Sequence, residues 1–332
     1  MRIRKTISFI LSFVCISGMA GGIAAYASGK AATVQESSME NAYIKLSVEQ
    51  DSNAGEYLRY KLDTVGGELI NKEDDGKNLT YKNFFSGLTT LNINGESFIY
   101  GKGKDEATPY FDAENKCHVS VQKYGDVIIE QRLTITEGFA SGYDDMLKIS
   151  YKVKNASEND KIGVRILIDP MISDDDSAKL TAGKAPVSNE AVFIAENIPS
   201  QWSATFSGTS KISAYGKVNT SEPAPSSLVF ANWDSLYDSI WDYSLDINKP
   251  ITDSAAAIKW ESISNAEGKE FSAYYGIKNL ASSGDNDGSV TIKGTPDTGV
   301  PSPLFTGSLF GASLISAGAL IYINRKRGGK NE

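Results

Sequence analysis

The residues best suited to chemistry lie in Phe230–Tyr243, where large aromatic residues alternate with acidic ones. Flat aromatic rings stack on the apolar faces of sugars. Carboxylate and amide groups accept hydrogen bonds from sugar hydroxyls. We therefore predict a glycan-binding site, with cell-wall or extracellular polysaccharide as the partner. Its residues are Asn232, Trp233, Asp234, Tyr237, Asp238 and Trp241.

The aromatic residues of this segment are regularly spaced. Trp233, Tyr237 and Trp241 are four residues apart, so a helical turn or a loop places their rings on one side. The alternative is structural. In that case the rings plug the open edge of a β-sandwich and the aspartates form turns.

Catalytic motifs are missing from the sequence. It has one histidine and two cysteines, which leaves too few groups for a zinc site or a Ser-His-Asp triad. It also has no phosphate-binding glycine loop. We therefore predict a non-catalytic structural or glycan-binding module. The alternative is a glycoside-active enzyme that uses two carboxylates, with four candidates: Asp169, Asp234, Asp238 and Asp242.

A second acidic group is the triplet Asp174, Asp175 and Asp176, just after an apolar run. Clustered carboxylates on a loop coordinate calcium through hard oxygen ligands. The alternative is a solvated acidic turn. No cofactor other than calcium is expected.

Short runs with a period of two dominate the middle of the chain, as in 42–48, 57–62 and 146–153. Asn94-Gly95 between apolar runs is typical of a β-hairpin. No part of the body has a convincing helical period. We predict an all-β fold: one large antiparallel β-sandwich over 39–280. Two tandem immunoglobulin-like sandwiches are the alternative.

The charge of the body is acidic. The formal net charge is -8, and both ends of the chain are basic, so the middle is more acidic than the total. Nucleic-acid binding needs a positive face. The composition therefore argues against a nucleic-acid partner.

The first segment is typical of a secretory signal peptide. Arg2, Arg4 and Lys5 precede an apolar stretch that ends at Ala25-Tyr26-Ala27. Small residues at this spacing indicate cleavage after Ala27. We therefore predict a signal peptide over 1–27.

The last segment is typical of a membrane anchor. Leu304 to Ile323 has no charged residue, and as a helix it would span roughly 30 Å. The basic tail 324–332 follows, and basic clusters stay on the cytoplasmic side. We predict a transmembrane helix over 304–323 with the body outside the cell.

Before this helix a tether over 281–298 ends in the pentapeptide Thr295, Pro296, Asp297, Thr298 and Gly299. With the apolar stretch and the basic tail, it resembles the sorting signal of sortase substrates in Gram-positive bacteria. The consensus begins with Leu where this chain has Thr295. The resemblance implies cleavage between Thr298 and Gly299 by a sortase, and attachment to the cell wall.

A further resemblance concerns the body. Thr64–Leu69, with its two glycines, and the following Asp74–Tyr81 resemble the opening of galactose-mutarotase-like supersandwich domains. The body as a whole also resembles an uncharacterised domain type of bacterial surface proteins. The resemblance implies a large sandwich. The histidine-based catalysis of those enzymes is not implied, because His118 is the only histidine.

Overall fold

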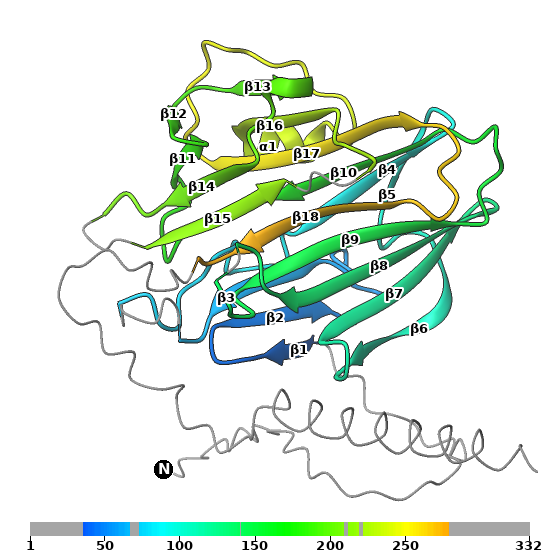
Figure 1. Ribbon diagram of the computed structural model, residues 1–332, viewed down its shortest axis with the longest axis horizontal. Helices are drawn as coiled ribbons and strands as arrows, with labels where there is room; N and C mark the ends of the chain where they lie inside the picture. The colour runs from blue at the N-terminus through cyan, green and yellow to red at the C-terminus, as the bar shows by residue number, and fades with distance from the viewer. Residues whose placement is uncertain (1–35, 67–72, 140, 209–211, 219–221, 279–332) are drawn as a thin grey trace, which may run out of the picture. The chain divides into compact units, whose positions relative to one another are not determined.

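Figure 1 shows the computed structural model of the chain, which describes residues 36–66, 73–139, 141–208, 212–218 and 222–278. Four predicted segments lie outside the described residues: 1–27, 281–298, 304–323 and 324–332. Within the described part of the chain, no helix is both long and apolar enough to cross a bilayer.

The largest sheet has nine antiparallel strands in the order β12-β11-β14-β15-β18-β9-β8-β7-β6 (Figure 1). Apolar and polar residues alternate along its strands. On β9, for example, polar residues separate the buried Ile149, Tyr151 and Val153. The strands are β6 Lys104–Asp112, β7 Cys117–Tyr124, β8 Val127–Thr136, β9 Met146–Lys154, β11 Lys179–Ala182, β12 Ala185–Val187, β14 Gln201–Thr205, β15 Ser213–Val218 and β18 Glu270–Gly276.

A six-stranded antiparallel sheet has the order β13-β16-β17-β10-β4-β5. Its central strand β10 is buried at every residue, which requires cover on both faces. The strands are β4 Leu88–Ile93, β5 Glu96–Ile99, β10 Ile162–Ile168, β13 Ala191–Ile194, β16 Ser227–Asn232 and β17 Ser254–Ile263.

A third sheet has the strands β1 Glu36–Glu40, β2 Ile44–Glu49 and β3 Tyr60–Thr64. It covers the part of the nine-stranded sheet made by β7 and β8. There, Gln50 Nε2 lies 3.0 Å from His118 Nε2, and Gln131 Nε2 lies 3.5 Å from Leu58 O. The β1–β3 sheet and the six-stranded sheet thus both pack on the nine-stranded sheet.

One hydrophobic core joins all three sheets. Trp202 on β14 contacts Phe230 on β16, with ring centroids 5.7 Å apart. Trp260 on β17 contacts Phe271 on β18 at 5.8 Å. The rings therefore bridge the nine-stranded and six-stranded sheets. The predicted all-β antiparallel sandwich is confirmed.

The turns follow their residue types. Asn94 and Gly95, between β4 and β5, have φ values of 55° and 91°. Both lie in the left-handed region, which the predicted two-residue hairpin requires. Gly125, between β7 and β8, has a φ of 61°.

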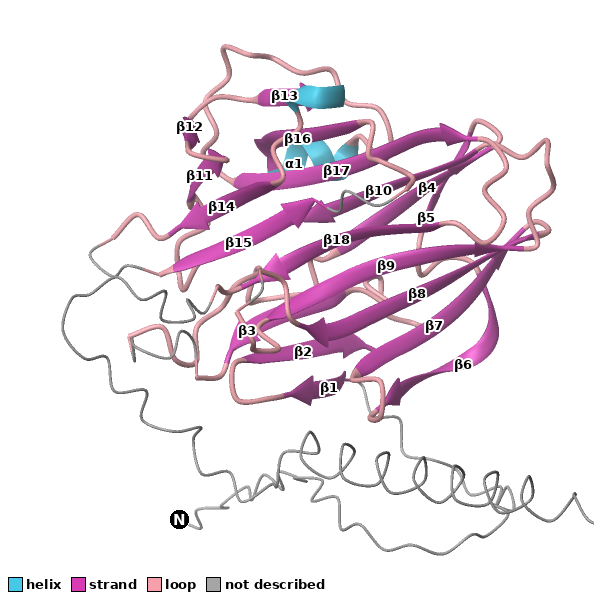
Figure 2. Ribbon diagram, in the orientation of Figure 1, coloured by secondary structure: helices cyan, strands magenta, loops and turns pink. Residues whose placement is uncertain are grey.

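Helical structure is sparse within the described residues, as the colours of Figure 2 show. A 3₁₀ turn covers Ala195–Asn197, and one α-helix, α1, covers Trp233–Asp238. Helix α1 lies on the outer face of the six-stranded sheet, where Leu236 packs with Leu167 and Ala257. It supplies the cover that β10 needs on that side.

Candidate functional site

Three aspartates from separate parts of the chain meet at one end of the six-stranded sheet. Asp169 directly follows β10, and Asp253 directly precedes β17. Since β10 and β17 are antiparallel neighbours, the end of one lies beside the start of the other. The loop after β10 brings in Asp176, whose backbone oxygen accepts a hydrogen bond from Ser254 N at 2.9 Å. We call these three residues the Asp169 cluster.

The side chains of the Asp169 cluster are close together and poorly solvated. One carboxylate oxygen from each residue lies within 4.8 Å of those of the other two. Asp169 is 1% exposed, and Asp176 and Asp253 are partly buried. Within the described residues, neither Asp169 Oδ1 nor Asp176 Oδ1 has a hydrogen-bond partner. Buried oxygens that lack a donor have lost water without replacement, so they are suited to hold a proton or a cation.

The electrostatics agree with that geometry. Burial, and then the charges of Asp176 and Asp253, raises the pKa of Asp169 to about 8. Burial and the Asp176 charge raise the pKa of Asp253 to about 6. Burial and the charge of Asp175 also raise the pKa of Asp176. Adjacent carboxylates with no counter-ion do not all ionise at neutral pH.

The predicted calcium triplet is divided between different partners. Asp174, which is exposed, forms an ion pair with Lys82 at 2.5 Å. Asp175 accepts hydrogen bonds from the backbone nitrogens of Ser207 at 2.6 Å and Ser177 at 3.1 Å. Of the three, Asp176 alone belongs to the Asp169 cluster. Sequence reasoning missed Asp253, which lies beside Asp169 and Asp176 in the cluster, whereas Asp174 and Asp175 do not belong to it.

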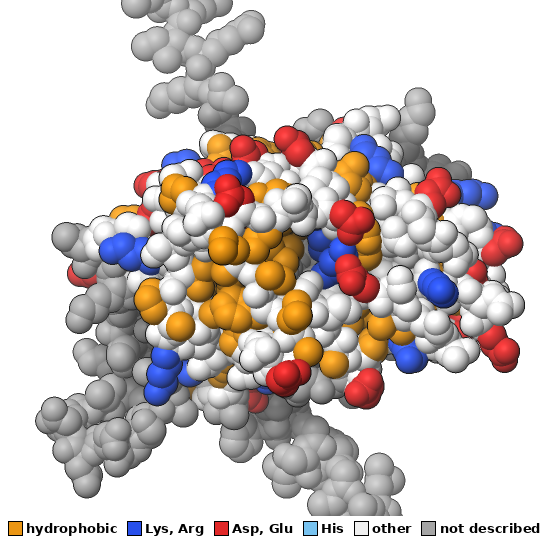
Figure 3. Space-filling model, turned by 90° about the horizontal axis from the view of Figure 1, so that it is seen from above, with side chains coloured by type: hydrophobic (Ala, Val, Ile, Leu, Met, Phe, Trp, Pro, Cys, Tyr) orange, Lys and Arg blue, Asp and Glu red, His pale blue; other side chains and the backbone are white. Residues whose placement is uncertain are grey.

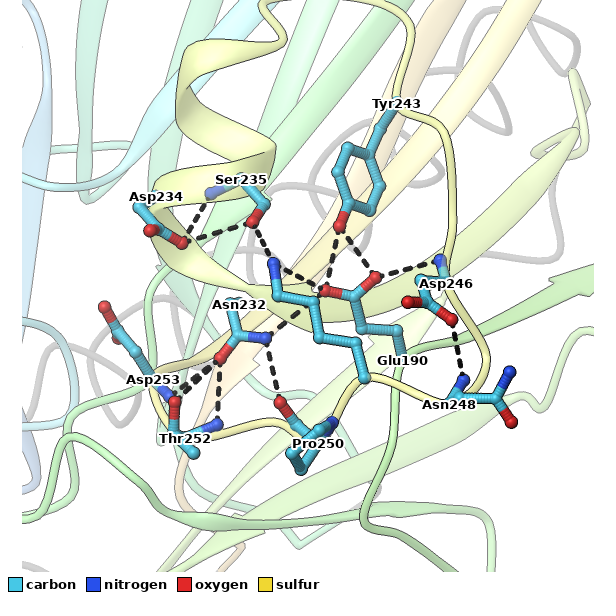
Figure 4. A network of polar contacts seen from close by, with 11 residues as sticks. Glu190, Asn232, Asp234, Ser235, Tyr243, Asp246, Asn248, Pro250, Thr252 and Asp253 are labelled. Carbon is cyan, nitrogen blue, oxygen red and sulfur yellow. Dashed lines mark hydrogen bonds and ion pairs between the residues drawn. The ribbon is translucent and has the colours of Figure 1, made fainter.

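Asn232 has a different role from the one predicted. Its Oδ1 accepts hydrogen bonds from the backbone nitrogens of Thr252 at 2.8 Å and Asp253 at 3.2 Å, while Nδ2 donates to Pro250 O at 3.0 Å (Figure 4). The side chain is 4% exposed. This amide fixes the approach to β17 and is engaged within the protein, so we do not count it among the glycan contacts.

Glu190 is the centre of the same network and was also missed. Tyr243 Oη donates to its two carboxylate oxygens, at 2.8 and 2.7 Å, and Lys249 Nζ lies 3.3 Å from Oε1 (Figure 4). Burial would raise the pKa of Glu190, but these interactions, with those of Asn232 and Asp246 N, hold it below its ordinary value. The ionised Glu190 therefore fastens the loop that follows α1.

Helix α1 carries two rows of candidate side chains. Trp233 and Tyr237, one turn apart and partly buried, have ring centroids 5.3 Å apart. Asp234 and Asp238 are also one turn apart, and both are exposed. The segment thus presents a pair of rings beside a pair of carboxylates. The predicted helical spacing holds for these four residues.

Trp241 lies outside this arrangement. The helix ends before Ile240, which has a φ of 51°. The Trp241 ring packs on β10, where a Cβ added to Gly163 would lie 2.5 Å from it. Lys259 Nζ lies 4.6 Å from the ring centroid and forms an ion pair with Asp242 at 2.9 Å. The three predicted rings therefore do not form one row.

A buried arginine holds the whole segment against the sheet. Arg165, 2% exposed on β10, donates to Leu236 O at 2.6 Å, Ser239 Oγ at 3.0 Å and Trp241 O at 3.3 Å. Burial lowers its pKa to about 10, so it remains charged at neutral pH. Its charge satisfies carbonyl groups at the end of α1 that have no partner within the helix.

Apolar side chains gather on the face that Figure 3 shows, which is seen from the side of β13. Exposed apolar residues on β13 and on the loop after α1 include Val192, Ile194 and Ile247. Acidic and basic side chains lie around this apolar area in the same view. This face is therefore mixed, with apolar and charged groups side by side.

Comparisons with known proteins give structural matches alone. No family model matches the chain, and no curated protein does. A 4-alpha-glucanotransferase from Thermococcus litoralis has a TM-score of 0.40 and 8% identity, over 74% of this chain and 38% of that one. A bacterial glucoamylase complexed with acarbose has a TM-score of 0.33 and 9% identity, over 71% and 31%. The chain thus spans about a third of the length of either match.

These matches correct one expectation. The sequence predicts a protein that is not an enzyme, but the two matched structures are of enzymes, a glucanotransferase and a glucoamylase. That prediction is wrong by this comparison, and we do not keep it. Likeness at this level gives no residue correspondence, so the assignment of residues depends on the geometry described above.

The Asp169 cluster makes stability dependent on pH when no cation is present. Between its ordinary pKa of 3.8 and its folded pKa of about 8, Asp169 keeps its proton in the folded chain and loses it in the unfolded chain. The free energy of unfolding, measured by urea denaturation with chelator present, is therefore expected to fall as pH rises through this window.

In Asp169→Asn, the free energy of unfolding is expected to change little with pH above about pH 6. Below that pH, the contribution of Asp253 to the pH dependence is expected to remain. Asp174→Asn is the matched control, because Asp174 is exposed and paired with Lys82. An unchanged slope in Asp169→Asn would contradict the assignment.

Proposed function

We propose that this is a carbohydrate-active protein that contacts glycan along α1. The observation that carries the proposal is the pair of rows on this helix, Trp233 with Tyr237 and Asp234 with Asp238. The partly exposed rings offer apolar surface on which a sugar face can stack. The carboxylates beside them accept hydrogen bonds from hydroxyl groups.

The ring pair is fixed before any ligand binds. The Arg59 guanidinium carbon lies 5.4 Å from the centroid of the Tyr237 ring, and Arg59 Nη2 lies 3.4 Å from Tyr237 Oη. Arg59 is 5% exposed, so it is itself held in place. A ring that is already ordered loses little conformational freedom on binding, which favours affinity.

We place this activity at the outer face of a Gram-positive-type envelope. The signal peptide over 1–27, the motif Thr295–Gly299 and the basic tail over 324–332 support that location. In this proposal a sortase cleaves after Thr298 and the cell wall receives the body.

Mass spectrometry of the digested cell-wall fraction tests the location. The expected result is a mature chain that begins after Ala27 and a C-terminal peptide that ends at Thr298 and carries wall fragments. Recovery in the membrane fraction of the body with an uncleaved Thr298–Gly299 bond, still joined to 299–332, would rule out sorting and leave a membrane-anchored protein.

Glycan binding is tested with Tyr237→Ala. An aromatic contact contributes roughly 0.5–1.5 kcal/mol, so retention on insoluble wall polysaccharide is expected to weaken by a factor of about two to thirteen. Pull-down at increasing polysaccharide gives the affinity, and thermal unfolding gives the melting temperature of the same sample.

Trp241→Ala is the matched control, because its ring packs on Gly163 of β10 and lies beside Lys259. It is expected to lower the melting temperature and to keep retention. If Tyr237→Ala binds as well as the parent chain, the stacking surface is not on α1.

Hydrolysis or transfer of glycosidic bonds is the second candidate function. Asp234 and Asp238 are one helical turn apart, which places their Cβ atoms roughly 5–6 Å from each other. Enzymes that retain anomeric configuration separate their two carboxyl groups by roughly 5–5.5 Å. One carboxyl group would protonate the leaving oxygen, and the other would attack the anomeric carbon before water releases the sugar.

A panel of wall and plant polysaccharides, assayed for new reducing ends, tests this chemistry. Each of Asp234→Asn and Asp238→Asn is expected to lower the rate by at least about a hundredfold. Asp174→Asn is expected to keep it. Absence of turnover by the parent chain, or turnover that survives both substitutions, would exclude these carboxylates as catalysts.

A further inference from the structure

The Asp169 cluster has no function in the glycan proposal, yet its geometry is specific. Its members come from the end of β10, the loop after it and the start of β17. Two members carry buried oxygens without a hydrogen-bond donor within the described residues. Within the described part of the chain, no lysine or arginine forms an ion pair with Asp169, Asp176 or Asp253.

The separations fit one ion. Calcium binds oxygen ligands at roughly 2.3–2.6 Å, so two oxygens that share one calcium ion are at most about 5 Å apart. The three carboxylate oxygens all lie within 4.8 Å of one another. Asp176 and Asp253 are partly exposed, which leaves room for water to complete the six to eight ligands that calcium takes.

We propose that Asp169, Asp176 and Asp253 bind a divalent cation, calcium, at the end of the six-stranded sheet. The unpartnered and nearly inaccessible Asp169 carboxylate oxygen is the second observation, beside the acidic cluster itself, that points to a ligand. Calcium is favoured over zinc because every ligand is a hard oxygen.

The site also has a structural consequence. The backbone oxygen of Asp253 accepts a hydrogen bond from Trp233 N at 2.9 Å. The backbone oxygen of Asp176 is bonded to Ser254 N. A bound ion therefore joins the loop after β10 to the start of β17 and, through Asp253, to the first residue of α1. The cation proposal does not depend on glycan binding.

Terbium luminescence tests the site with the full chain, because Tb³⁺ replaces calcium at oxygen sites and is sensitised by a nearby tryptophan, here Trp233. The expected result is terbium emission that calcium displaces. In parallel, calcium is expected to raise the melting temperature of the chelator-treated protein, since it binds the folded state.

Asp169→Asn and Asp253→Asn are each expected to remove both the emission and the calcium-dependent rise in melting temperature. Asp174→Asn, which alters an exposed acid in the same loop, is expected to keep both. Near-ultraviolet circular dichroism shows whether each variant is folded, and Asp253→Asn, whose side chain is partly exposed, is the variant best placed to fold.

The proposal is overturned if folded Asp253→Asn keeps the displaceable emission, or if calcium stabilises it as much as the parent chain. It is also overturned if the parent chain shows no displaceable emission. Tyr237→Ala lies outside the cluster and is expected to keep terbium binding, so failure of the glycan proposal and failure of the cation proposal give different results.

Discussion

The outer face of the six-stranded sheet is apolar and must be shielded from water, and the arrangement of the candidate sites depends on this constraint. The central strand β10 is buried along its whole length, and the nine-stranded sheet covers one of its faces. The other face carries Leu167 and its apolar neighbours on β16 and β17. The segment around α1 covers this face, and Leu236 is its buried contact.

Two buried charged residues hold that segment in place. Arg165 binds the backbone at the end of α1, and Glu190 binds the loop that follows. Each is charged, nearly inaccessible and satisfied mainly by hydrogen bonds, which is the condition under which a buried charge is tolerated. The exposed carboxylates and the partly exposed rings on α1 are thus carried on a support that is itself well fixed, and positioning of this kind favours binding with little loss of entropy.

The sequence predicts those features that depend on local pattern. Alternation predicts the class of fold, and Asn94-Gly95 predicts a hairpin, because both depend on neighbouring residues. The edge strands β6 and β12 escape prediction, since an edge strand with exposed side chains lacks a clear apolar face.

The sites were less predictable, for a physical reason. Asp169 and Asp253 are brought together by the pairing of β10 with β17, and nothing near either residue in the sequence specifies that partner. Asn232 has an amide that could bind a sugar hydroxyl, but this amide is hydrogen-bonded to the backbone of Pro250 and Thr252, just before β17. The spacing of four residues places Trp233 and Tyr237 one helical turn apart but does not extend to Trp241, since the helix ends at Asp238 and Ile240 has a positive φ.

The two edge strands of the nine-stranded sheet, β6 and β12, determine whether that sheet can pair with a strand of another molecule. Strand β6 has two shifts in its register with β7 and contains Pro109, and β12 is three residues long and contains Pro186. Proline and an irregular register remove the continuous row of donors and acceptors that another strand needs for pairing. These two edges of the nine-stranded sheet are therefore poor templates for pairing with a strand of another molecule.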